Sequence, residues 1–141
     1  MFEHIFGPLL VGNSVAVVED PAGINPPSTI LQTEDPWRVH VDWSITNGAA
    51  PFLGGDWEVR VYAESIGGGF EGLLGSVTVP LNSAPALPLP RTYHAFVNVA
   101  GGSLAAGAYR LVTLINYSNL GVPLEMAAFE EGPIIQVYAH V

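Results

Sequence analysis

The 141-residue chain contains no lysine, and four arginines are its only residues with a permanent positive charge. Asp and Glu together number 13, which gives a formal net charge of −9 at pH 7. A surface that binds nucleic acid needs many lysine and arginine side chains to neutralise phosphates. The scarcity of positive charge therefore argues against a nucleic-acid partner, and it disfavours anionic membrane surfaces for the same reason.

Cysteine is also absent, which excludes disulfide bonds, zinc–thiolate sites and cysteine nucleophiles. Long hydrophobic runs are missing as well. The apolar stretch at residues 8–18 is broken by Gly-Asn-Ser and is too short to span a bilayer, so we expect no membrane span. The N-terminus lacks the basic start of a secretory signal, which favours an intracellular protein unless a leader has been removed.

Charged residues make up only 12% of the chain, about half of the usual ~25%. Apolar residues make up 49%, and the mean hydropathy is +0.36. Large apolar patches on soluble proteins usually mark contact surfaces, and lysine is depleted in interfaces. The composition therefore favours a protein whose surface is covered by a partner, such as further copies of itself.

Glycines and prolines separate short runs that are rich in Val, Ile, Tyr, Trp and Thr, a pattern typical of all-β domains. In the clearest run, residues 37–45, apolar and polar residues alternate, so one face points to a core. Residues 109–117 are apolar on both faces and predict a central strand. The best candidate for a helical turn is residues 120–129. The expected strands lie at residues 14–18, 37–45, 56–64, 73–81, 92–99, 109–117 and 134–141.

About seven strands at this spacing predict an immunoglobulin-like antiparallel β-sandwich. We interpret residues 1–29 as an N-terminal segment, or arm, that holds one early strand. Residues 30–141 then form the β-sandwich domain. Trp43 and Trp57 fall on the predicted core faces, where a sandwich normally places tryptophan.

Two segments resemble a known family. They are Val-His-Val-Asp-Trp-Ser-Ile-Thr-Asn-Gly at residues 39–48 and Leu-Ala-Ala-Gly-Ala-Tyr-Arg-Leu-Val at residues 104–112. Both are similar to strands of the immunoglobulin-like adhesion modules of bacteria and archaea (CARDB-like domains). In the second motif of that family, the glycine makes a corner and the tyrosine starts a core strand. The resemblance implies a binding or assembly module without catalysis.

Polar residues on two predicted outer faces offer a candidate metal site. If the strands at residues 37–45 and 56–64 pair as neighbours, then His40, Asp42 and Glu58 meet on one surface. A histidine with carboxylate ligands can bind a divalent metal ion. The simpler interpretation is a solvated sheet face with cross-strand ion pairs such as Asp42–Arg60.

Other catalytic patterns are missing from the sequence. His4, His94 and His140 are isolated, and none has the spacing of a ligand pair. No G-x-S-x-G motif is present, and the triple glycine at residues 67–69 is not followed by the Gly-Lys-Ser/Thr of a phosphate loop. The acidic pairs at residues 34–35 and 130–131 lack the spacing of a calcium loop. We expect no catalytic residues and no cofactor.

Three aromatic residues outside the predicted core are candidate ligand contacts. Trp37, Tyr62 and Tyr138 could stack on a sugar, although core or interface packing is the simpler interpretation for aromatic side chains. The apolar N-terminal residues Phe2, Ile5 and Phe6 are candidates for an arm that docks on a neighbouring subunit, for example by strand addition to a sheet edge.

The leading hypothesis is a non-enzymatic β-sandwich subunit that assembles with itself or with another protein. The first alternative is a module that binds carbohydrate or another small ligand. The second is a metal-dependent enzyme built on His40, Asp42 and Glu58.

Overall fold

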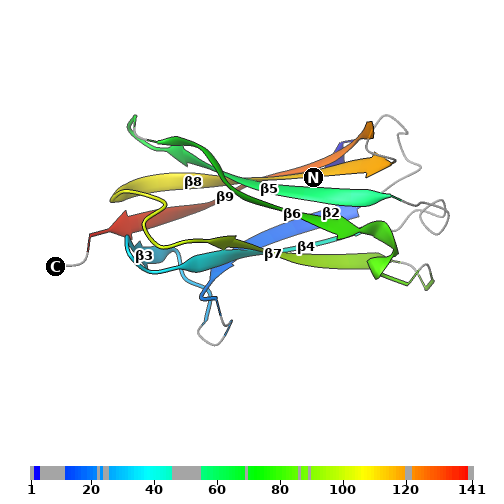
Figure 1. Ribbon diagram of the computed structural model, residues 1–141, viewed down its shortest axis with the longest axis horizontal. Coiled ribbons are helices and arrows are strands. Elements are labelled where there is room, and N and C mark those ends of the chain that lie inside the picture. The colour runs from blue at the N-terminus through cyan, green and yellow to red at the C-terminus, as the bar shows by residue number, and fades with distance from the viewer. Residues whose placement is uncertain are drawn as a thin grey trace.

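The computed structural model describes residues 2–3, 12–21, 23, 26–45, 55–68, 70–85, 87–88, 90–119 and 122–139. These residues form two β-sheets that lie one above the other (Figure 1). One sheet has the strand order β1-β9-β8-β5-β6, with β3 added beside β9, and the other has the order β2-β4-β7. The strands are β1 (Phe2–Glu3), β2 (Gly12–Glu19), β3 (Ile30–Gln32), β4 (Trp37–Ile45), β5 (Asp56–Ser65), β6 (Glu71–Pro80), β7 (Arg91–Val99), β8 (Gly107–Asn119) and β9 (Val122–Tyr138).

The predicted all-β sandwich is confirmed, and each of the seven expected strands overlaps one of these elements, although β6 ends at Pro80 and β9 at Tyr138, before the predicted ends at residues 81 and 141. Strand β4 has the predicted limits, and β8 is central because it pairs with β9 on one side and β5 on the other. All pairs between described strands are antiparallel except β3 with β9, which is parallel. The short strands β1 and β3 were not expected from the sequence.

The helical turn expected at residues 120–129 is wrong. Residues 122–129 form the first half of β9, which pairs with β8 on one side and with β1 on the other. The segment contains residues that favour helices, such as Leu, Glu, Met and Ala. Pairing along two neighbouring strands outweighs those weak local preferences.

The core lies between the sheets because alternating residues of each strand point inward. In β4 the residues Val39, Val41 and Ile45 are at most 1% exposed. Residues facing them from β5 and β8 are equally buried, including Val59 and Leu111. Burying this apolar area from both sheets is the main force that holds the two layers together.

Four aromatic side chains occupy one end of the core. Trp43 stacks on Tyr93 with ring centroids 5.6 Å apart, and Trp57 meets Trp43, Tyr93 and Tyr117 in edge-to-face geometry. Both tryptophans are thus buried, as predicted. Burial raises the pKa of Tyr93 and of Tyr117, since an ionised phenol would lose its hydration there.

The motif at residues 104–112 has the predicted geometry. Gly107 begins β8, and Leu104 and Tyr109 are both buried. The hydroxyl of Tyr109 donates a hydrogen bond of 2.8 Å to the carbonyl of Ala105, which ties the start of the strand to the preceding loop as a tyrosine corner does.

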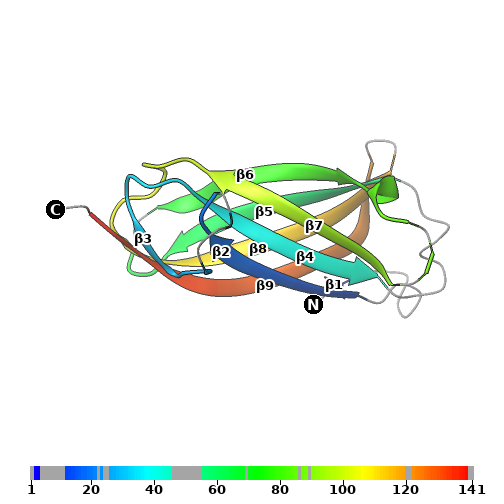
Figure 2. The same cartoon turned by 90° about the horizontal axis from the view of Figure 1, so that it is seen from below.

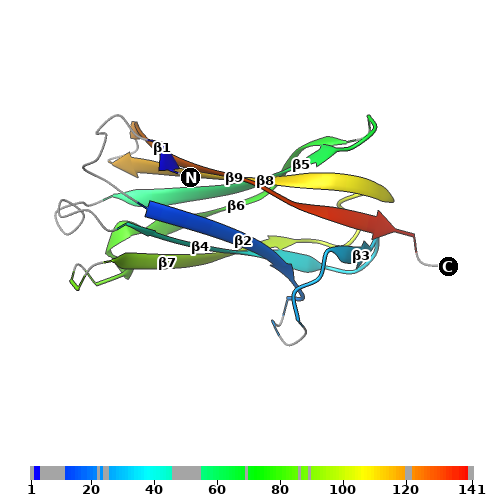
Figure 3. The same cartoon turned by 180° about the vertical axis from the view of Figure 1, so that it is seen from behind.

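The early strand predicted within the N-terminal segment is β2. It pairs with β4 from Gly12 to Glu19 and forms one edge of the three-stranded sheet, on the side where β9 lies (Figure 3). Of the described residues before β2, Phe2 and Glu3 pair with Ala128 and Ala127 of β9. In the described part of the chain, no helix has the length and apolar character needed to cross a membrane.

Candidate functional site

The three-stranded sheet lies in front in Figure 2, and its outer face carries a cluster of interacting polar side chains. Alternation in β4 directs His40 and Asp42 to the same face. Pairing with β7 sets Asp42 opposite His94 and His40 opposite Phe96. Directly opposite residues in antiparallel strands have Cβ atoms about 5 Å apart, so the sheet itself brings His40, Asp42 and His94 together.

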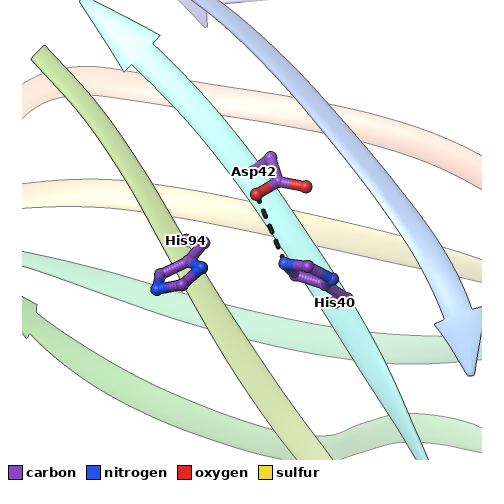
Figure 4. Close-up of side chains that lie close together, drawn as sticks. All are labelled: His40, Asp42 and His94. Atoms are coloured by element: carbon purple, nitrogen blue, oxygen red, sulfur yellow. Dashed lines mark ion pairs between the residues drawn. The ribbon is translucent and has the colours of Figure 1, made fainter. Parts of the chain in front are cut away.

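The three side chains gather over β4 and β7 (Figure 4). Nε2 of His40 lies 3.3 Å from Oδ1 of Asp42, and the ring centroids of His40 and His94 are 5.9 Å apart. One ligand atom from each of the three residues can be chosen so that all lie within 4.8 Å of one another. Nε2 of His40 is buried and makes no hydrogen bond.

An ion pair between Arg38 of β4 and Glu19 of the neighbouring strand β2 lies beside His40. Nε of Arg38 donates a hydrogen bond of 2.6 Å to Oε1 of Glu19, and the other carboxylate oxygen of Glu19 lies 3.7 Å from Nδ1 of His40. The guanidinium of Arg38 sits 3.9 Å from the ring centroid of Phe96, which in turn packs 4.5 Å from the ring of His40. His40 therefore contacts Glu19, Asp42 and Phe96, whereas the exposed Asp42 is held through His40.

The structure brings together two of the three predicted metal ligands. Glu58 would join them only if β4 and β5 paired as neighbours, and these strands belong to different sheets. Glu58 instead accepts a hydrogen bond of 2.6 Å from Nε of Arg60. This hydrogen bond is the main reason why the pKa of Arg60 is raised, and a second hydrogen bond, with the side chain of Tyr62, adds a smaller effect. The Asp42–Arg60 ion pair expected from the sequence does not form, because Asp42 and Arg60 also lie on different sheets. The third residue of the cluster with His40 and Asp42 is His94 of β7.

The outer face of the six-stranded sheet carries an apolar row. The register places Tyr62 of β5 between Leu73 of β6 and Val112 of β8. Leu73 is 50% exposed, and Leu114, two residues beyond Val112 on the same face, is half-buried. The row borders a shallow groove of about 410 Å³. Tyr62 is thus on an outer face, as expected.

The two remaining aromatic candidates meet at one end of the sandwich. Trp37 at the start of β4 and Tyr138 at the end of β9 line the same cleft of about 250 Å³. Trp37 is only 5% exposed and also packs in the core, whereas Tyr138 is 42% exposed. Nε2 of Gln32 donates a hydrogen bond of 3.4 Å to the hydroxyl of Tyr138. The structure therefore pairs Trp37 with Tyr138 and separates both from Tyr62.

The candidates for the N-terminal arm are only partly described. The backbone of Phe2 belongs to β1, while Ile5 and Phe6 lie outside the described residues.

No protein-family model matches the chain, and no curated protein matches it. Among solved structures, a β-glucosidase from Listeria innocua in complex with glucose is similar over 94% of this chain and 16% of that chain, with 11% identity and a TM-score of 0.54. A β-glucosidase from Erythrobacter marinus is similar over 92% of this chain and 16% of that one, with 12% identity and a TM-score of 0.52. These likenesses show a shared fold.

The CARDB domain of a Pyrococcus furiosus protein, described in complex with di-metal ions, is also similar to this chain. The similarity covers 90% of this chain and 89% of that one, with 16% identity and a TM-score of 0.48. It is a domain of the kind that the two sequence motifs resemble.

Proposed function

We propose that this chain is a non-enzymatic β-sandwich subunit that binds further copies of itself through the outer face of the six-stranded sheet. The observation that carries this proposal is the apolar row of Leu73, Tyr62 and Val112, which runs from the edge strand β6 across β5 to β8. Val112 is only 6% exposed, but Leu73 is 50% exposed and Tyr62 is half-buried, so the apolar area that a partner surface can cover lies on β6 and β5.

The surroundings of the row fit an interface between two like surfaces. The row is flanked by Glu64 and Glu71 and by the Arg60–Glu58 pair, whose side chains are 38% and 39% exposed. Protein interfaces commonly have such an apolar centre with tyrosine and a polar rim. The face carries both signs of charge, because Arg60 and Arg110, two of the four arginines in the chain, lie on it. A second copy therefore brings complementary charges to the rim.

Light scattering on the intact protein at tens of micromolar tests this proposal. We expect a mass that is a multiple of the 14.9 kDa chain mass. A monodisperse monomer at that concentration contradicts self-association. It would leave the face free for a different protein.

The proposed arm can be tested in the same measurement. Removing residues 1–11 leaves β2, which starts at Gly12, in place. If Phe2, Ile5 and Phe6 contribute to the contact, the truncated chain has a lower average mass while its circular dichroism spectrum is unchanged. Full assembly of the truncated chain rules out a role for the arm and leaves the sheet face as the contact.

The cleft between Trp37 and Tyr138 supports a second candidate function, the binding of a small polar ligand such as a sugar. The cleft combines aromatic surface with Gln32 and with carboxylates of Glu19 and Asp35, and its volume is near the lower end for small-ligand sites. A titration with mono- and oligosaccharides should change the tryptophan fluorescence of the wild type but not of Trp37→Phe. An unchanged spectrum at millimolar sugar contradicts this candidate.

A further inference from the structure

We propose that His40, Asp42 and His94 form a binding site for a divalent transition-metal ion of the Zn²⁺ type on the outer face of the three-stranded sheet. This inference does not depend on self-association, because the site lies on the opposite sheet from the proposed contact.

The backbone already places the three ligands. His40 and Asp42 are two residues apart on one strand, so they share a face, and His94 is the cross-strand partner of Asp42. Ligands held by two hydrogen-bonded strands lose less freedom on binding than ligands on loops. The strand pair is long, since β4 and β7 are paired from Trp37 with Val99 to Ile45 with Arg91. The site therefore rests on a rigid part of the fold.

The donor atoms identify the class of metal. Two imidazole nitrogens and one carboxylate oxygen suit Zn²⁺, Co²⁺ or Ni²⁺, whereas Ca²⁺ and Mg²⁺ prefer sites made of oxygen alone. Zinc sites often use three protein ligands and leave the fourth position to water. A cleft of about 230 Å³ beside Asp42 and His94 leaves room for such a fourth ligand.

The second ring nitrogen of His40 lies near a carboxylate, the group to which a metal-binding histidine often donates a hydrogen bond. Its Nδ1 is 3.7 Å from the carboxylate of Glu19, which Arg38 holds in place, so a shift of a few tenths of an ångström would form that hydrogen bond. A carboxylate on one ring nitrogen favours the tautomer whose other nitrogen is free to bind metal. In His40 that other nitrogen is Nε2, which is buried and makes no hydrogen bond. Glu19 is therefore the positioning residue for this ligand.

Side-chain rotations complete the site. In a tetrahedral zinc site with bonds of about 2.1 Å, two ligand atoms lie about 3.4 Å apart. The ligand atoms here lie within 4.8 Å of one another, so some of them must move closer by up to about 1.4 Å. Asp42 and His94 are both exposed, so their side chains can turn toward the ion without disturbing the core.

The alternative is an ordinary polar cluster in which His40 sits between Glu19 and Asp42 and binds no metal. Isothermal titration with Zn²⁺ on the full chain distinguishes the two, and the absorption spectrum of bound Co²⁺ reports nitrogen and oxygen ligands. We expect one ion per chain with at least micromolar affinity and a rise in the melting temperature when Zn²⁺ is present.

Variants locate the ion. His94→Ala and Asp42→Asn should each weaken Zn²⁺ binding at least tenfold, and the double variant His40→Ala/His94→Ala should abolish it. Glu58→Gln on the other sheet is the control and should bind like the wild type. Circular dichroism shows whether each variant folds, and Asp42→Asn keeps nearly the same shape if the alanine variants do not fold. No binding at millimolar Zn²⁺, or equal binding by the double variant, overturns the proposal.

Discussion

The two outer faces of this sandwich differ sharply although the two inner faces are alike. On the three-stranded sheet, Glu19, Arg38, His40 and Phe96 contact one another in a closed chain of ion pairs and ring contacts. On the six-stranded sheet, an apolar row crosses β6, β5 and β8, and the ion pair beside it is a local one between Glu58 and Arg60 of the same strand. The charged groups of the first face pair with one another and leave Nε2 of His40 without a hydrogen bond, whereas the second face leaves apolar area of Leu73 uncovered.

This difference indicates that the inner faces of the sheets determine the fold, while the outer faces are available for function. The inner faces of both sheets bury Val, Ile, Leu and Trp side chains and hold the layers together. The outer faces are not needed for that core, so they can carry different chemistry. We infer a metal site on the self-contained polar face and a protein contact on the apolar face. Variants on one face should therefore leave the property of the other unchanged.

The largest effect is expected for Leu73→Glu on the six-stranded sheet. A carboxylate in the apolar row must lose its hydration when a second copy covers it. Disrupting one of the few hot-spot residues of an interface costs about 2 kcal/mol or more, so we expect association to weaken by about 30-fold if Leu73 is such a residue. Light scattering or sedimentation over a range of concentrations measures this change.

Val15→Glu is the matched control for Leu73→Glu. Val15 is 56% exposed on the outer face of the three-stranded sheet, opposite Asp42, and Leu73 is 50% exposed. Both variants add one negative charge to a half-exposed strand position. Equal loss of mass in the two variants would mean that charge alone, and no particular face, governs association. Leu73→Glu should also bind Zn²⁺ as the wild type does.

Much of the fold could be predicted because alternation within a strand depends only on local sequence. The pattern in residues 37–45 gave the limits of β4 and assigned each side chain to a face. Residues 120–129 could not be assigned in this way, because what makes them a strand is pairing with β8 and β1. Only two residues separate the end of β8 from the start of β9, but they carry no clear hairpin signal, and β1 is distant in sequence and only two residues long.

The candidate metal site could also be predicted only in part, because local sequence does not show which strands are neighbours. That His40 and Asp42 share a face followed from their spacing. The third residue depended on which strand lies beside β4, and the sequence neighbour β5 was the natural expectation. The chain instead crosses to the other sheet after β4 and returns at β7, which replaces Glu58 by His94. The alternation of residues 92–99 already placed His94 on a polar face, but no local signal related it to His40.

A smaller effect should distinguish the ion pairs of the two faces. Arg38 and Glu19 are 17% and 12% exposed, and Arg38 also lies over Phe96, whereas Arg60 and Glu58 are more than a third exposed. Removing a partner from a shielded, charge-assisted hydrogen bond costs about 1.5–3 kcal/mol, while an exposed pair is worth about 0.5 kcal/mol. We therefore expect Arg38→Ala to lower the free energy of unfolding by about 2 kcal/mol and Arg60→Ala by about 0.5 kcal/mol.

Urea unfolding at two salt concentrations measures this difference and tests its origin. Salt screens exposed pairs more than shielded ones, so the cost of Arg60→Ala should shrink in high salt while most of the cost of Arg38→Ala remains. Arg38→Met keeps some of the apolar contact with Phe96 and should recover part of the loss. Equal costs for Arg38→Ala and Arg60→Ala would show that the closed chain of contacts on the three-stranded sheet adds nothing to stability. The polar character of that face would then have to be explained by binding alone.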